Sequence, residues 1–580
     1  MILQALKEYY DRKAADPESG IAPVGLEWKP LEFLIVINET GGFVRIEDMR
    51  EQIGKKNVGK RFLLPRSIPR AGSKSYETTF LLWDHIGYLL GYPMDDPKSP
   101  NQLNTWIQSL NKLPDELKAE KAVQAILNFY AMDQLALVNE DPNINACLKS
   151  IPCNMSFRLE SELEPVAAMQ SVLNYAMKKM QDQGEDGEAI KGYCLVSGEC
   201  DIIKKIHAKT PINKDNNSLI SFQVNSGYDS YGKIKAFNAP VGVISEFSYT
   251  TALNTLLKSD VQRFSIADTI YVCWSQRNNA FDADFSFLFD SYKGSDDPDQ
   301  YTRCVKALYD SIHTGAIYKD DVDQDFYVLA LSPGGGSRIA IRDWQKGKIS
   351  EFSNRVYQHF DDLKIIKPSY EREHYSPGWI LKNIAIQDET KNIPPNIAGE
   401  FMRSILNGTP YPQTLLQAAV RRIKSDTENR VKPVRAALVK AYLNRYLQVH
   451  PDNSQKELNM ALDKEQPSIG YQLGRLFAVY EKVQEEANGK ATIQQSYYSS
   501  ASSSPIVAFG TLARLNKHHI SKLERDKPRL AVVRKKMIGE IMDHVMAFPG
   551  HLDLKEQGKF AIGYYHQMQD FYATNEEKSN

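Results

Sequence analysis

The chain has few cysteines for its length, with six among 580 residues. So small a number does not suit a disulfide framework and fits a reducing compartment. Long apolar runs are also lacking, because the strongest, residues 31–37, has the length of a strand and not the roughly 20 residues that span a bilayer. Ile2, Leu6, Tyr9 and Tyr10 lie at helical spacing and predict an amphipathic N-terminal helix rather than a signal peptide. We therefore expect a cytoplasmic protein without a membrane segment.

Catalytic signatures are scarce as well. HExxH, GxSxG and CxxC do not occur. Residues 54–61 match a phosphate-binding P-loop until Arg61, which stands where Mg²⁺ requires Ser or Thr, so a flexible basic loop is the preferred interpretation. Residues 321–332 open like a calcium loop, but Phe326 replaces the required glycine and Ser332 the required glutamate, which leaves an acidic turn before a strand.

The cysteines offer one possible metal site. Cys147 and Cys153 enclose five residues, as do Cys194 and Cys200, whereas zinc knuckles usually enclose two to four. Buried, inert thiols are therefore favoured over a four-thiolate zinc site. We expect no metal, no cofactor and no catalytic residue, so the chain is predicted not to be an enzyme.

The formal net charge is only −1, but the charges are segregated. Residues 52–76 carry seven Lys or Arg and no acid, residues 417–445 carry eight basic and two acidic side chains, and residues 512–536 carry nine and two. Each segment alone could be a solvated surface. Three together favour local contacts with nucleic-acid phosphates within an otherwise neutral protein.

The N-terminal two-thirds has mixed patterns. Residues 31–46 predict a β-hairpin that turns at Gly41 and Gly42, and residues 193–197, 270–274, 326–331 and 338–342 predict further strands. From about Pro394 the strand patterns stop and helical periodicity takes over. The predicted fold class is α+β, with a mixed α/β N-terminal region over residues 1–393 and an all-α C-terminal helical bundle over residues 394–580.

Two apolar stripes mark the predicted bundle. The stripes are Leu473, Leu476, Phe477, Tyr480, Val483 and Ala487, and Leu530, Val533, Met537, Ile541 and Val545. The serine-rich residues 496–504 between them predict a loop.

Nine segments, in one order along the chain, resemble the large subunit of the type I-C CRISPR Cascade surveillance complex, the Csd-type Cascade large-subunit family. They are FLLWDHIGYLLG (80–91), YCLVSGE (193–199), SFQVNSGYDSYGK (221–233), FNAPVGVISEFSYTTALNTLL (237–257), NGTPYPQTLL (407–416), VRAALVKAYLNR (434–445), YQLGRLFAVYEKVQ (471–484), HHISKL (518–523) and FPGHLDLKEQGKFAIGYYHQ (548–567). The resemblance therefore covers nearly the whole chain.

The resemblance implies a non-catalytic subunit. Its partners would be the Cascade backbone subunits, the guide RNA at its 5′ handle end, and small subunits. It would recognise the protospacer-adjacent motif in double-stranded DNA, promote R-loop formation, stabilise the displaced non-target strand and recruit the helicase-nuclease. Guide pairing reads the target sequence, while protein reads shape, phosphates and the adjacent motif.

These tasks need different side chains. Phosphate contacts on duplex DNA need Lys and Arg, and the candidates are Lys55, Lys56, Lys60, Arg61, Arg66, Arg70 and Lys74. Reading base edges suits amides and hydroxyls, and the candidates are Asn57, Gln223, Asn225 and Ser226, although residues 221–233 are equally typical of plain turns. Holding the displaced strand needs a basic track, and the candidates are Arg421, Arg422, Lys424, Arg435, Lys440, Arg514, Lys517, Lys522, Arg534, Lys535 and Lys536.

The family resemblance also implies a small subunit made by internal translation. Met460 is the predicted start, since it precedes the first stripe, and residues 460–580 would then resemble a Cascade small subunit. Two alternatives remain open: a nucleic-acid-processing enzyme, such as a nuclease with a cryptic carboxylate site, and a scaffold that never contacts DNA.

Overall fold

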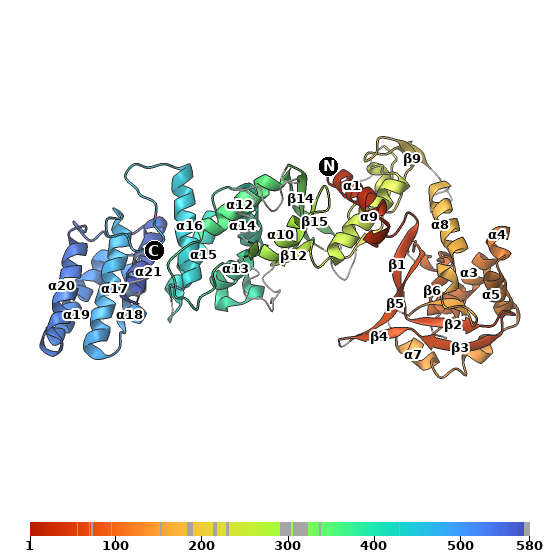
Figure 1. Cartoon of the computed structure of the whole chain (residues 1–580), viewed down its shortest axis with the longest axis horizontal. Helices are drawn as coiled ribbons and strands as arrows, with labels where there is room; N and C mark the ends of the chain where they lie inside the picture. Colours follow the sequence, from red (N-terminus) through yellow and green to blue (C-terminus); the bar gives the residue numbers. More distant parts are fainter. Residues whose placement is uncertain are drawn as a thin grey trace. The chain divides into compact units, whose positions relative to one another are not determined.

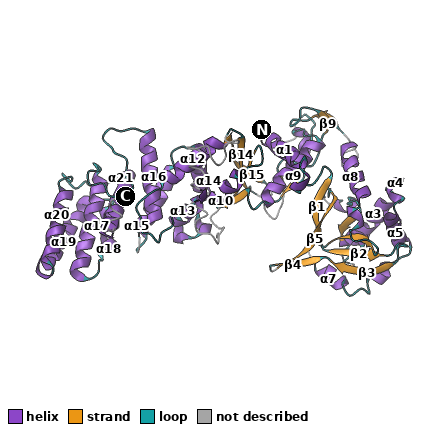
Figure 2. Cartoon of the chain, in the orientation of Figure 1, coloured by secondary structure: helices purple, strands orange, loops and turns teal. Residues whose placement is uncertain are grey.

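The computed structural model describes residues 1–54, 56–68, 70, 74–93, 96–150, 153–182, 190–212, 217–224, 226–227, 231–289, 303–304, 323–335, 338–427 and 430–572. The chain forms two compact units: unit 1 is Met1–Leu257 with Ser337–Ile339, and unit 2 is Lys258–Gly336 with Ala340–Asn580 (Figure 1). Strands and helices mix in the N-terminal part and helices prevail in the C-terminal part, which confirms the predicted fold class (Figure 2). The functional division at residue 393 stays a prediction. No helix among the described residues is both long and apolar enough to cross a membrane.

Unit 1 contains most of the strands. Its strands are β1 (Leu26–Leu31), β2 (Phe33–Ile37), β3 (Phe43–Asp48), β4 (Arg50–Ile53), β5 (Lys56–Pro65), β6 (Trp83–His85), β7 (Asn154–Leu159), β8 (Lys191–Tyr193), β9 (Cys200–Ile202), β10 (Lys209–Thr210) and β11 (Asn217–Ser218). Its helices are α1 (Ile2–Ala14), α2 (Ile86–Leu89), α3 (Ser99–Asn111), α4 (Asp115–Lys118), α5 (Lys121–Ala131), α6 (Leu135–Val138), α7 (Ile144–Lys149), α8 (Gln170–Asp182) and α9 (Val243–Lys258).

The core of unit 1 surrounds a four-stranded sheet in the order β3-β2-β7-β6. Every residue of β2 is buried, as expected for a continuous apolar run with both faces covered. The predicted hairpin is confirmed, because β2 pairs antiparallel with β3. Gly41 adopts a φ of 97° at the turn, and a Cβ there would lie 2.6 Å from the Ala125 carbonyl oxygen. Only glycine suits this position.

Two further predictions for unit 1 concern the N-terminal helix and the strand at residues 193–197. The N-terminal helix is confirmed as α1, whose Tyr10 donates to the Ala22 carbonyl oxygen (3.0 Å) and meets the Phe247 ring edge-on at 5.6 Å. The strand predicted at 193–197 is wrong. Strand β8 ends at Tyr193, and the Ser-Gly pair that follows turns the chain back, with Gly198 at a φ of 77°.

Unit 2 begins with a four-stranded sheet in the order β12-β13-β14-β15. The strands are β12 (Arg263–Ile266), β13 (Thr269–Ser275), β14 (Asp325–Pro333) and β15 (Ile339–Lys348), so the three predicted strands in this stretch are confirmed. Asp325, the first residue of β14, pairs with Lys346 and Lys348 of β15 at 2.9 Å each. Residues 321 and 322 of the predicted acidic turn lie outside the described residues.

Helices form the rest of unit 2. They are α10 (Phe281–Phe289), α12 (Ile349–Asp362), α13 (Pro377–Ile384), α14 (Pro395–Asn407), α15 (Gln413–Ser425), α16 (Pro433–Val449), α17 (Ile469–Asn488), α18 (Ile493–Ala501), α19 (Pro505–Asp526), α20 (Pro528–Met542) and α21 (Leu554–Tyr572). Helices α17 to α21 pack on one another as a C-terminal bundle (Figure 1).

The bundle is closed by a tight contact between α17 and α21. A Cβ at Gly474 would lie 2.0 Å from the Phe560 carbonyl oxygen, and a Cβ at Gly563 would lie 2.0 Å from that of Tyr471. Both distances are impossible for a real side chain, so glycine lets the two backbones touch. The first predicted stripe faces this packing, and all of its members except the half-buried Ala487 are buried.

One prediction for the bundle is wrong, and another needs a correction at a single residue. Residues 496–504 are not simply a loop, because helix α18 continues to Ala501; the buried Tyr498 and Ala501 hold it against the bundle. The second stripe is confirmed except at one position: Ile541 and Val545 are buried and Met537 packs against the core, but Val533 is 47% exposed whereas Arg534 is buried. Arg534 is buried because Glu486 neutralises its charge, with Nη2 to Oε1 at 2.6 Å.

Candidate nucleic-acid interface

The first half of the basic segment 52–76 lies in β4 and β5, which form a β-ribbon. Strand β5 pairs antiparallel with β4 over its first half and with β1 over its second half. The interpretation of residues 54–61 as a flexible basic loop is therefore wrong from Lys56 onward, where β5 begins. Gly59 lies where β5 changes its partner from β4 to β1. A Cβ there would be 2.4 Å from the Leu31 carbonyl oxygen, so glycine is needed for the strands to pack.

The ribbon presents cations on both of its faces. Lys60 and Arg61 are neighbours in β5 and both are exposed, so their side chains point to opposite faces. Lys60 lies over the Phe62 ring, with Nζ 5.3 Å from its centroid, which leaves the ammonium at the surface. Lys56 begins the strand, and Lys55 lies outside the described residues.

Arg66 is engaged inside unit 1. It forks onto Glu246, with Nη1 to Oε2 at 3.1 Å, and also donates to Thr250 Oγ1 at 3.2 Å. The Glu246 carboxylate is fully buried; burial raises its pKa, but Arg66 and other cations lower it below the ordinary value. Glu246 is 180 residues away in the sequence, so the residues around Arg66 do not predict this ion pair.

Arg70 is engaged in the same way. Its guanidinium pairs with the fully buried Asp84, with Nη1 to Oδ1 at 2.8 Å, and lies 3.8 Å from the Phe80 centroid and 4.0 Å from that of Tyr88. Both faces of the guanidinium are therefore covered. Lys74 is exposed and lies 3.8 Å from Glu77.

The proposed base readers are exposed where the structure describes them. Asn57 lies on β5 opposite Gln52, next to the turn of the ribbon. Gln223 and Ser226 are exposed, and Ser226 Oγ donates to the Val224 carbonyl oxygen at 3.4 Å. Asn225 lies outside the described residues. Within the described part of unit 1, no hydrogen bond joins Asn57 to Gln223 or Ser226.

In unit 2, Arg422 and Arg435 belong to an internal ion-pair network. Arg435 is fully buried and donates to Asp388 Oδ1 at 3.1 Å, while Arg422 donates to the same oxygen at 3.1 Å. Both also pair with Asp426, and Lys432 reaches Asp388 Oδ2 at 2.7 Å. This network fastens the segment after α13 to α15 and α16. It leaves little of either guanidinium for a ligand.

Three more predicted cations face inward. Lys424 donates to Ser503 Oγ (2.7 Å) and Gln557 Oε1 (2.6 Å), and burial lowers its pKa. Lys440 is buried, which also lowers its pKa. Arg534, bound to Glu486, stacks 4.6 Å from the Phe571 centroid.

The remaining bundle cations are exposed on α19 and α20. Arg514 and Lys517 are exposed and form no ion pair among the described residues, and Lys522 donates to Asn488 Oδ1 at 3.0 Å. Lys535 pairs with Glu524, and Lys536 lies 4.0 Å from Glu540. Positions 514, 517 and 522 fall on one face of α19, which we call the α19 cation face.

Arg525 was not among the predicted residues and extends the α19 cation face. It is exposed, eleven positions after Arg514, and lies 3.1 Å from Asp526. Helical periodicity predicts such a face when it is applied to Lys and Arg as well as to apolar residues.

Arg421 lines a shallow hollow between α15 and α21 of about 440 Å³. Lys424, Gln417, Ser425 and Gln557 are also in its wall, and no acid is among the described lining residues. Such a surface suits a phosphate.

All six cysteines are free thiols, and Cys147 and Cys153 are neighbours whose thiols share a hydrogen bond. Five of the six are buried and Cys200 is exposed. The Cys194 sulfur accepts hydrogen bonds from the backbone N–H groups of Val196 and Ser197, at 3.4 and 3.5 Å. No group of three or more His, Cys, Asp or Glu suited to a metal is found in the described parts of the chain.

Comparison with protein-family models identifies a family. The model of a protein family described as CRISPR-associated protein (Cas_Csd1) matches residues 6–572, nearly the whole chain. No curated protein matches it.

Proposed function

Because the chain belongs to the CRISPR-associated protein (Cas_Csd1) family and is thus a Cascade subunit, we propose that it is the non-catalytic large subunit of a type I-C complex. It recognises the protospacer-adjacent motif, promotes R-loop formation, stabilises the displaced strand and recruits the helicase-nuclease in the cytoplasm. One observation supports this best: after internal ion pairs are accounted for, exposed cations remain on strand β5, at the base of the β4–β5 ribbon, and on the α19 cation face.

The ribbon is proposed to contact duplex DNA. The two-stranded β4–β5 ribbon fits a DNA groove, and Lys60 and Arg61 at its base, where β5 pairs with β1, point to opposite faces toward phosphates on both sides. Asn57 near the turn then offers an amide to base edges, with Gln223, Asn225 and Ser226 as further readers. Arg66 and Arg70 stabilise the fold beside the ribbon instead of binding phosphate.

The α19 cation face is proposed to hold the displaced strand. Arg514, Lys517 and Lys522 follow one helix face, as a phosphate backbone requires of a basic track. The hollow beside Arg421 offers a further phosphate site in unit 2. These contacts are electrostatic and independent of sequence, which suits a strand that is not read.

Met460 is proposed as an internal start that yields a small subunit. It lies, 53% exposed, in the non-helical segment between α16 and α17, so a product of 121 residues, 460–580, keeps α17 to α21 intact. The backbone contact at Gly474 is internal to that product. The α19 cation face also lies within it.

The test is reconstitution of the complex from backbone subunits and guide RNA, with and without this chain. Binding to target duplexes with a randomised flanking motif should require the chain and depend on the motif. Replacing the responsible reader among Asn57, Gln223, Asn225 and Ser226 by Ala should cost about 1–3 kcal/mol of discrimination. Equal binding without the chain would contradict the proposal, and cutting by the chain alone with Mg²⁺ would favour a nuclease.

A further inference from the structure

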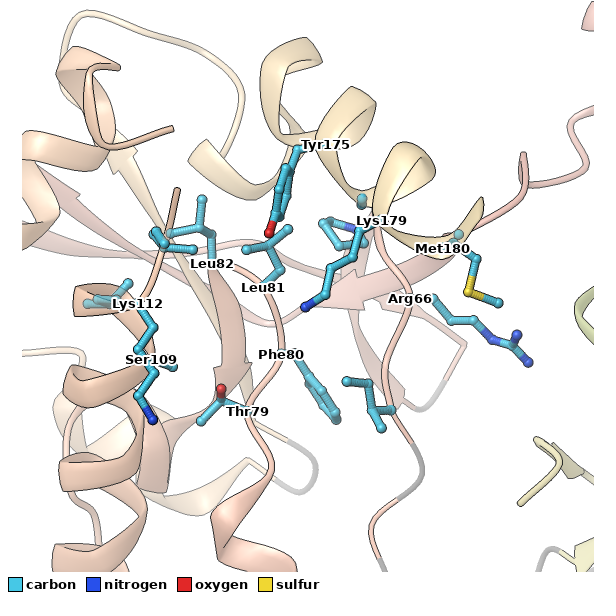
Figure 3. A pocket seen from close by; sticks show the side chains of 16 residues that line it. Arg66, Thr79, Phe80, Leu81, Leu82, Ser109, Lys112, Tyr175, Lys179 and Met180 are labelled. Atoms are coloured by element: carbon cyan, nitrogen blue, oxygen red, sulfur yellow. The ribbon is translucent and has the colours of Figure 1, made fainter. Parts of the chain in front are cut away.

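Unit 1 contains a hollow of about 250 Å³ that none of the proposed DNA contacts uses. Its walls are α3, α8 and two stretches, residues 65–68 after β5 and residues 79–82 before β6 (Figure 3). Trp83 Nε1 donates to the Pro65 carbonyl oxygen at 2.9 Å, which joins the ends of these two stretches. Gly25, at a φ of 84°, allows α8 to pack closely, because a Cβ there would lie only 3.0 Å from the Ala176 carbonyl oxygen. The hollow is therefore built on fixed elements.

The floor of the hollow is aliphatic. Leu81, Leu82, Leu110 and Leu113 line it together with Met180, and the Phe80 and Tyr175 rings stand at its edges. Leu81 and Leu113 are only half-buried. An apolar side chain that entered would bury apolar surface on both partners, at about 25 cal/mol per Å².

The rim of the hollow is positive. Lys112 directly follows α3 and Lys179 lies in the last turn of α8; both are exposed and neither forms an ion pair among the described residues. Figure 3 shows Lys179 and Tyr175 extending from α8 toward Leu81, whereas Arg66 points out of the hollow. No acidic residue is among the described lining. The occupant should therefore carry negative charge beside its apolar part.

A nucleotide and an acidic peptide both combine an apolar body with negative charge. A nucleobase would press its polar edge atoms against leucine and methionine, and each polar atom left without a partner costs about 1–3 kcal/mol. Stacking also needs flat surfaces, of which only Phe80 and Tyr175 are offered. An aliphatic or phenyl side chain has no such penalty. The floor thus discriminates against a base and in favour of a peptide.

We propose that this hollow docks a segment of a protein partner in which one large apolar side chain stands next to Asp or Glu. The apolar side chain packs on Leu81 and Leu113, and the carboxylates face Lys112 and Lys179. The site is distinct from the β4–β5 ribbon, so its loss should leave DNA contacts of the ribbon intact.

The test uses the full chain within Cascade purified with its other subunits and guide RNA. Ser109, which lines the hollow and donates only to the Trp106 carbonyl oxygen of its own helix (2.7 Å), is replaced by the photocrosslinker p-benzoylphenylalanine. Irradiation is carried out on the complex alone and after addition of target DNA and the helicase-nuclease. The result expected is an adduct with one protein, located by mass spectrometry to a peptide with an apolar residue beside Asp or Glu.

Charge reversal provides the matched comparison. Lys112→Glu with Lys179→Glu should lower the yield of that adduct about tenfold, since two exposed ion pairs of up to about 1 kcal/mol each become repulsive. Lys121→Glu with Lys178→Glu changes the net charge equally on exposed positions of α5 and α8 outside the lining, and should leave the yield unchanged. An adduct with nucleic acid only, no adduct with any protein, or equal loss in both pairs of variants would overturn the proposal.

Discussion

Replacing Arg435 by Ala should destabilise unit 2 without weakening DNA binding. Arg435 is fully buried and donates to Asp388 Oδ1 (3.1 Å) and to the Asn383 carbonyl oxygen (2.7 Å), besides its pair with Asp426. Its removal leaves two carboxylates with fewer partners. Breaking one partner of a buried ion pair costs about 3–5 kcal/mol. Arg422 still reaches both carboxylates, so we expect the lower end, about 3 kcal/mol.

The assay is urea unfolding of the full chain, followed by circular dichroism at 222 nm because unit 2 is largely helical. Arg421→Ala is the matched control: it lies on the neighbouring helix α15 but is exposed, so its effect should stay within about 0.5 kcal/mol. Under conditions where both variants are folded, Arg435→Ala should bind target DNA as the parent does. The internal role of Arg435 would be refuted if Arg435→Ala had the same free energy of unfolding as the Arg421→Ala control. It would also be refuted if Arg435→Ala bound DNA with a lower salt dependence than the parent.

Three further predictions concern the bundle. Burial raises the pKa of Glu481 to about 7. The protonated carboxyl therefore contributes stability that is present below about pH 4.5 and is lost as pH rises through 7. In urea titrations Glu481→Gln should be about 2 kcal/mol more stable than the parent at pH 8 and similar to it at pH 4.5. Gly474→Ala should cost at least about 2 kcal/mol in the same titrations because its Cβ would collide with the Phe560 carbonyl oxygen, whereas Gly510→Ala, with open space around it, should gain about 0.5–1 kcal/mol. Intact mass spectrometry of the expressed complex should find a species near 14 kDa that disappears when the Met460 codon is changed; its absence, or its survival of that change, would contradict the internal start.

Local patterns were sufficient to predict the elements with strong periodicity. Strand β2 reads as five apolar residues in a row and α17 as a regular apolar stripe, and both were predicted correctly. The ribbon was missed because β5 begins with polar and charged residues, which carry no apolar alternation. Helix α18 was missed because serine is typical of loops, whereas Tyr498 and Ala501 anchor it by tertiary packing.

The candidate interface shows a different limit. A run of Lys and Arg predicts where positive charge is concentrated, but not which side chains are available to a ligand. Arg66 is bound by Glu246, and Arg534 by Glu486, both from other elements of the same unit. Such pairings depend on the fold. Only the structure separates them from Arg61, which is exposed on the ribbon.

The central claim is that the exposed cations of the ribbon contact target DNA. The most direct test is the salt dependence of binding by assembled Cascade carrying Lys60→Ala and Arg61→Ala, compared with the parent and with Lys121→Ala and Lys178→Ala. Loss of two phosphate contacts should flatten the slope of log K against log salt concentration by up to about 1.8 on duplex DNA, for every target sequence. The control should keep the parent slope. An unchanged slope in the ribbon variant, or an equal change in the control, would contradict the account.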